Sequence, residues 1–109
     1  MIANLSGTPS RLCQKAIGAT STTLYTAQPD GRTVIIDMLI TNTTGSSINL
    51  TMYIGSVATA NAFGWYVTPV AANSSVKYNG YQILNANESL LAVGSTTGLT
   101  ATISGLERI

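Results

Sequence analysis

Apolar and polar residues alternate with a period of two along much of the chain, and the spacing of an amphipathic helix is hard to find. The clearest case is the segment 48–54, INLTMYI, where every second residue is apolar and Asn49, Thr51 and Tyr53 lie between them. This pattern predicts a strand with one buried face and one face in water.

The preceding segment, 33–41, would carry apolar residues on both faces of a strand. Every second residue from 34 to 40 is apolar, and Ile35 and Leu39 are apolar on the opposite face, which also carries Asp37. The run is therefore predicted to be a central strand that is covered on both sides.

The polar segment 42–47, NTTGSS, separates these two runs and contains a glycine that can adopt a positive φ. We therefore predict that the runs pair as a β-hairpin. The core residues expected from it are Ile36, Ile40, Leu50 and Met52. Upstream, a strand over 22–26 is expected to end at a turn in 28–31, QPDG.

Four further segments have strand composition and are separated by turn residues: 63–68, 75–79, 89–93 and 99–104. About seven to eight short strands with regular turns are typical of an all-β fold, here a single antiparallel β-sandwich of jelly-roll type. Residues 1–12 show no strand period, so an extended N-terminal arm or tail is predicted, followed by a sandwich domain over 13–109.

Charge is scarce in this chain. Charged residues make up 8% of its 109 residues, and the net charge is +1. The five basic residues form no stripe that would neutralise phosphates, so nucleic acid is not expected as a partner. No apolar run approaches the length of a membrane span, and the first residues do not resemble a signal peptide. Synthesis in a cytoplasm is therefore expected, and the lone Cys13 is expected to be a buried or half-buried thiol.

Catalytic chemistry has few candidate residues. The chain has no histidine, which removes the commonest general base and metal ligand. Of the four carboxylates, only Asp37 and Glu88 are candidates to face each other, and Glu88 follows a predicted turn. We expect a non-enzymatic protein without catalytic residues, cofactor or metal site.

Aromatic side chains offer a candidate binding surface. Phe63, Trp65 and Tyr66 cluster in FGWYV, and Tyr78 and Tyr81 follow in VKYNGY. Such side chains favour interfaces and sugar platforms. Alternation places Phe63 and Trp65 on one face and Tyr66 on the other, so only part of the cluster is expected to be exposed.

The segment LYTAQPDGRTVIIDMLITNTTGSSINLTMYIG resembles one that recurs in small β-sandwich virion proteins of tailed bacteriophages, and the resemblance extends from Thr22 to the end of the chain. It implies a virion structural protein. We expect a capsid decoration (cement) protein that binds the major capsid protein, or another virion protein, on the outside of the capsid. The alternatives are a tail, neck or fibre component, or a carbohydrate-binding host-adhesion module.

The excess of apolar positions implies association, because a small sandwich needs only one buried face per strand. A homo-oligomer is expected, with a trimer favoured by the resemblance to decoration proteins. The residues expected at an interface are Ile2 and Leu5 in the arm, Ile35, Asp37 and Leu39 in the central strand, and the two tyrosines Tyr66 and Tyr81.

Overall fold

The computed structural model describes residues 10–29 and 31–108, with only the backbone of residue 108. These residues form eight strands and one short 3-10 turn, η2 (Thr59–Asn61). The strands are β1 (Ser10–Ile17), β2 (Thr22–Thr26), β3 (Arg32–Asn42), β4 (Ile48–Ile54), β5 (Thr68–Val70), β6 (Ser75–Leu84), β7 (Ser89–Gly94) and β8 (Leu99–Arg108). In this part of the chain, no helix has the length and apolar character needed to cross a membrane.

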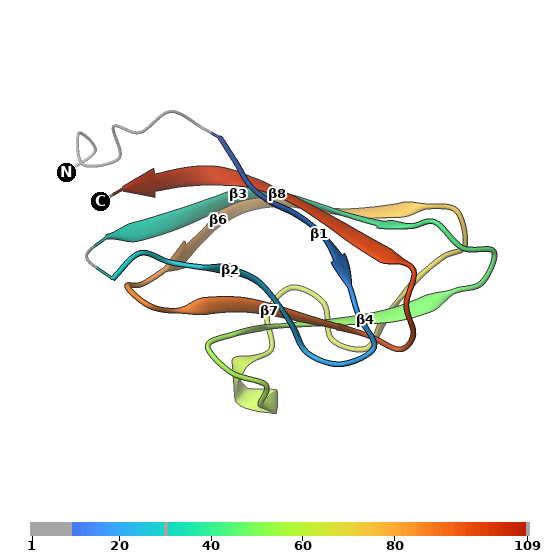
Figure 1. Ribbon diagram of the computed structural model, residues 1–109. Helices are drawn as coiled ribbons and strands as arrows, with labels where there is room; N and C mark the ends of the chain where they lie inside the picture. Colours follow the sequence, from blue (N-terminus) through green and yellow to red (C-terminus); the bar gives the residue numbers. More distant parts are fainter. Residues whose placement is uncertain (1–9, 30, 109) are drawn as a thin grey trace.

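The strands form two four-stranded sheets that pack face to face (Figure 1). Sheet A has the order β1-β8-β3-β6 and sheet B the order β2-β7-β4-β5, with antiparallel pairing throughout. The chain changes sheet at every connection except the one from β4 to β5, which is the topology of a jelly roll. The predicted all-β sandwich is therefore confirmed.

The predicted hairpin between the two central runs is wrong. Both runs are strands, but β3 lies in sheet A and β4 in sheet B, because both edges of β3 already pair with β6 and β8. The connecting loop is an arch between the sheets, organised by the fully buried Asn42. The amide of Asn42 donates hydrogen bonds to the carbonyls of Ser46 (2.7 Å) and Val70 (3.0 Å), and its Oδ1 accepts one from the Thr44 N–H (2.9 Å).

A β-bulge interrupts the alternation of β3. Its residues Ile35 and Asp37 pair with consecutive residues of β8, so Ile36 is an extra residue between them. The bulge needs Gly105 on β8, because a Cβ there would overlap the backbone carbonyl of Val34.

The bulge changes which side chains of β3 enter the core. Ile35 and Met38 are both fully buried, whereas Ile36 is half-buried. The prediction that Ile36 is a core residue is therefore wrong, because strict alternation cannot be carried across the bulge. For the other three residues the prediction is confirmed, since Ile40, Leu50 and Met52 are fully buried.

Strand β1 has no counterpart in the sequence prediction. It buries only Cys13 and Ile17, and its register with β8 shifts between Arg11 and Cys13, so its alternation is weak. Because the strand begins at Ser10, the sandwich includes residues 10–12, which the sequence pattern places in the arm. The rest of the predicted arm, with Ile2 and Leu5, lies outside the described residues.

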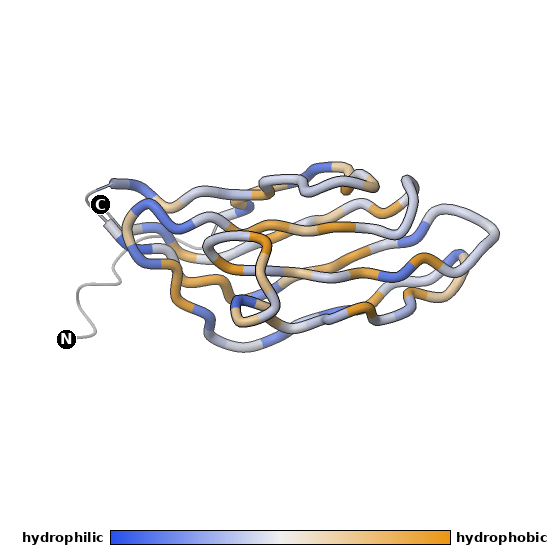
Figure 2. Tube along the Cα trace, turned by 90° about the horizontal axis from the view of Figure 1, so that it is seen from below, coloured by the Kyte–Doolittle hydropathy of each residue, from blue (hydrophilic) through white to orange (hydrophobic). Residues whose placement is uncertain are grey.

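The core lies between the sheets. Apolar residues are distributed along the strands, whereas the connections at the two ends are mainly polar (Figure 2). Near β4 and β6, the Tyr78 ring packs edge-on against Phe63 and Trp65, at centroid distances of 5.3 and 6.4 Å. The strand predicted over 63–68 is wrong in its bounds, because this segment forms a loop beside β4 and β5 begins only at Thr68.

Candidate interaction surface on sheet A

The residues expected at an interface lie in different places. Leu39, Tyr66 and Tyr81 are exposed, with 40%, 53% and 65% of their surfaces accessible. Ile35 is fully buried because the bulge turns it into the core, which removes it from the candidate interface. Asp37 is half-buried on the outer face of β3.

Strand pairing arranges the outer face of sheet A in rows across the strands. One row runs from Asn79 through Asp37 and Ser104 to Arg11, and the next contains Lys77, Leu39, Thr102 and Gln14. The third row consists of Ser75, Thr41, Thr100 and Ala16. These side chains point outward because their neighbours Met38, Ile40, Ala101 and Ile103 are in the core. We refer to these three rows as the outer face of sheet A.

Asp37 is the unusual residue of this face. Its Oδ1 is buried by the chain itself and has no hydrogen-bond partner among the described residues. A buried carboxylate oxygen without a partner is unfavourable, since its hydration has not been replaced. Arg11 lies in the same row, two strands away and therefore at a backbone distance of about 10 Å. Arg11 does not stand out in the sequence, because β1 lacks a clear strand pattern.

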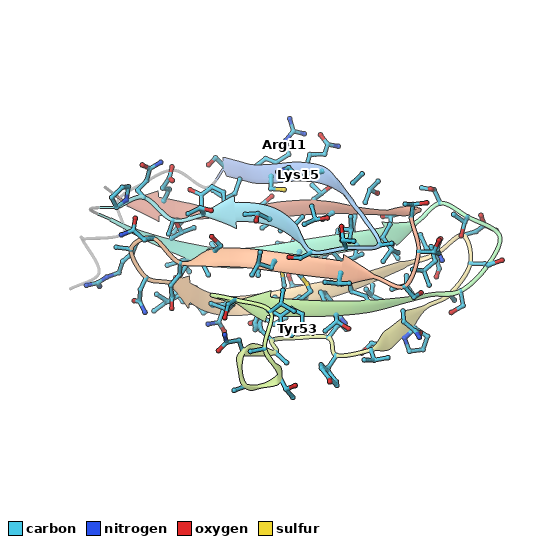
Figure 3. The ribbon with its side chains drawn as sticks, turned by 60° about the horizontal axis from the view of Figure 1, so that its bottom comes forward. Arg11, Lys15 and Tyr53 are labelled. Carbon is cyan, nitrogen blue, oxygen red and sulfur yellow. The ribbon has the colours of Figure 1, made fainter. Side chains whose placement is uncertain are left out.

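The two basic residues of β1, Arg11 and Lys15, point to opposite faces of sheet A. Arg11 is exposed and lies in the row of Asp37. Lys15 points to the other face, where its Nζ donates a 2.9 Å hydrogen bond to the Thr23 carbonyl of β2. Both side chains project from β1, one of the two edge strands of sheet A (Figure 3). Only Arg11 is therefore in position to contact a protein that lies on the outer face.

Segment 55–67 runs along the edge of β4 in sheet B and bonds to one side chain of the outer face. The Val67 N–H donates a 2.9 Å hydrogen bond to Thr51 Oγ1 on the outer side of β4. Thr51 and Leu91 are buried, and Tyr53, labelled in Figure 3, is half-buried on the same face. Val67 has a φ of 46°, a strained conformation for a β-branched residue.

The aromatic platform predicted around Trp65 is not assembled. Trp65 is half-buried and packs against Tyr78, whereas Tyr66 is exposed. Tyr81 belongs to β6 of sheet A, and Tyr66 precedes β5 of sheet B. Trp65 therefore has a structural role in closing the sandwich.

The remaining carboxylates in the described part of the chain are engaged in structural contacts. Glu88 closes the turn before β7, where its Oε1 accepts a 2.8 Å hydrogen bond from the Asn85 N–H. Glu107 accepts a hydrogen bond from the Tyr25 hydroxyl, which links β8 to β2 across the sandwich. Burial, and next this hydrogen bond, raises the pKa of Tyr25. Asp37 and Glu88 therefore lie in unrelated settings, one on a sheet face and one in a turn.

The thiol and the possible metal ligands offer no further site in the described residues. Burial raises the pKa of Cys13, which disfavours the reactive thiolate. No group of three or more His, Cys, Asp or Glu side chains within residues 10–29 and 31–108 is placed to hold a metal ion.

Neither a protein-family model nor a curated protein matches this chain. Among solved structures, the chain is similar to a protein of Bacillus endospore appendages, described as a novel family of disulfide-linked pili. The identity is 13% and the TM-score 0.56, and the likeness covers 93% of this chain and 86% of the other. At this identity, the likeness supports the sandwich fold and nothing finer.

Proposed function

We propose that this chain is a non-catalytic structural subunit of a larger protein assembly, located on the outside of a bacteriophage capsid. The observation that carries the proposal is the outer face of sheet A. There the exposed Leu39 lies on the same strand as Asp37, a charged residue that is only half-buried. A neighbouring protein would bury the leucine and bring an opposite charge to the accessible part of Asp37, so both features favour a surface that is completed by assembly.

The resemblance of the sequence from Thr22 onward to small virion proteins supports the capsid as the location. The major capsid protein, or another virion protein, is then the surface to which the chain binds. The low charge of the chain fits this role, because a neutral surface gives little repulsion between closely packed neighbours.

A subunit of a filamentous appendage is the second candidate. It is favoured by the likeness in fold to the pilus protein over 93% of this chain. In a filament, copies of the chain would bind mainly to one another and would need no capsid.

Particle composition and electron microscopy separate the two candidates. For decoration, we expect the chain in purified virus particles, at a fixed copy number relative to the major coat protein, and no filaments from the chain alone. Filaments formed by the purified chain would favour the appendage. Absence from particles together with absence of filaments would overturn the assembly role.

A matched pair of variants tests the surface itself. Leu39→Lys places a charge on the outer face of sheet A, whereas Val57→Lys places one on the exposed segment 55–67. We expect Leu39→Lys to lower the copy number in the assembly and Val57→Lys to leave it unchanged. The reverse result would move the contact to segment 55–67.

A further inference from the structure

We propose that the outer face of sheet A is a contact between two copies of this chain, in which Asp37 of each copy pairs with Arg11 of the other. This inference rests on the proposed assembly role and deepens it by naming one partner, a second copy. It starts from three residues of one row, with Asp37 on β3, Ser104 on β8 and Arg11 on β1.

The order of this row makes the face self-complementary. Strand β8 lies midway between β1 and β3, so Asp37 and Arg11 lie at about equal distances on either side of it, near 5 Å each. When a second sheet A is laid on the first about a two-fold axis along β8, the row is reversed. Asp37 then lies opposite Arg11 of the second copy, and Arg11 lies opposite its Asp37.

The side chains at the proposed axis permit close approach. The outer residues of β8 in the three rows are Ser104, Thr102 and Thr100, which are all small. In the second row, Leu39 comes to lie over Gln14 of the other copy, which covers part of the exposed leucine. Lys77 lies on the edge strand β6 and remains at the rim, where charges have little effect on affinity.

Charge also selects this arrangement over a shifted one. With the axis along β3, Asp37 would face Asp37 of the second copy, and with the axis along β1, Arg11 would face Arg11. Like charges in such positions oppose association. The axis along β8 instead places the half-buried Asp37 of each copy opposite the exposed Arg11 of the other, and opposite charges in such positions favour association.

Charge reversal and mixing test the proposal by sedimentation velocity of the purified chain. Asp37→Arg and Arg11→Asp each place like charges opposite one another, so each variant alone is expected to dimerise about tenfold or more weakly than the parent. An equal mixture restores both pairs, because a copy with Asp37→Arg and a copy with Arg11→Asp carry opposite charges at both contacts. We therefore expect dimers from the mixture and monomers from each variant alone.

Mixing distinguishes a contact between copies from an ion pair within one copy. If Arg11 reached Asp37 of its own chain, mixing the single variants would restore nothing. Lys15→Asp is the control, since it makes the same change of charge on the opposite face of the same strand and is expected to leave dimerisation within about twofold.

A parent chain that remains monomeric, or a mixture that remains monomeric, would overturn the two-fold contact. Neither result would decide the proposed assembly role, because a monomer can still bind a capsid. Absence of the chain from purified particles and filaments would instead overturn that role and leave the dimer measurement standing.

Discussion

The outer faces of the two sheets differ in what covers them. On sheet B, segment 55–67 runs beside β4, Thr51 accepts a hydrogen bond from the Val67 N–H, and Leu91 is buried. On sheet A, Leu39 is exposed, and a buried oxygen of Asp37 has no partner among the described residues. Both faces belong to the same small sandwich, but the chain's own loop satisfies the polar group on only one of them.

This difference shows that an excess of apolar positions in a strand does not by itself reveal a partner surface. Ile35 contributes to the predicted excess, yet it enters the core through a bulge, and Leu91 on the outer side of β7 is buried within the chain. The informative feature is exposure in the folded chain, and on the outer face of β3 it is Leu39 that remains exposed.

The largest expected effect comes from the bulge that separates the two faces of β3. Ile35→Ala should lower the free energy of unfolding by about 2 to 5 kcal/mol, because it empties a fully buried site. Ile36→Ala should cost roughly half as much or less, since that side chain is half-buried. Denaturant unfolding measures both, and equal losses would contradict the bulged register.

Gly105→Ala should act on the same bulge from β8. The added methyl group would overlap the carbonyl of Val34, so we expect a loss of about 1 to 3 kcal/mol in unfolding free energy. Gly45→Ala is the control, because no atom in the described part of the chain lies within 4 Å of a Cβ at that glycine. If Gly105→Ala were as stable as the control, β3 and β8 would not approach as closely as described.

The contact between Tyr25 and Glu107 joins the two sheets, and Tyr25→Phe should cost about 1 kcal/mol near neutral pH. The effect should depend on pH, because the pKa of Tyr25 is raised in the folded protein above its usual 10.0. The stabilisation is fully present below pH 10 and is lost as the pH rises through the raised pKa.

The parent should therefore lose stability above pH 10 more steeply than Tyr25→Phe. Thermal melts at pH 8 to 11 would reveal the difference, with the exposed Tyr66→Phe as the control. Parallel pH profiles for the parent and Tyr25→Phe would argue against the link between the sheets.

The smallest expected effect concerns the hydrogen bond between Val67 of segment 55–67 and Thr51 of β4. Thr51→Val keeps the shape of the side chain but removes the acceptor for the Val67 N–H, at a cost of about 0.5 to 1 kcal/mol. Hydrogen exchange at Val67 should become faster, whereas Thr23→Val at an exposed position should not change it. Unchanged exchange would mean that Thr51 does not hold the segment in place.

Strand positions in the centre of the chain follow closely from the sequence. The alternation in 48–54 marks β4 with its observed bounds, because this strand has a regular apolar face. The strand expected over 22–26 also has the observed bounds of β2. Strand β1 is not predicted from apolar alternation, since it is an edge strand with few buried residues and a shift in register. Alternation also does not predict which strands pair, because the residues of the arch at 42–47 are equally suited to a hairpin.

The candidate surface was predictable only in part. Asp37 stands out in the sequence as a charge in an apolar run, and Leu39 as an apolar residue on its second face. Arg11 could not be linked to them, because its place in the row depends on long-range pairing of β1 with β8. Information about such pairing is not contained in local alternation.

The central place of β8 in sheet A also determines when this fold can form. Strand β8 pairs with β1 on one side and β3 on the other, so two strands from the first 42 residues depend on residues 99–108 for their partners. Contacts of such long sequence separation make folding slow. During synthesis, β1 and β3 must remain unpaired with β8 until residues 99–108 have been made. The chain is therefore most vulnerable to aggregation before this late strand is in place.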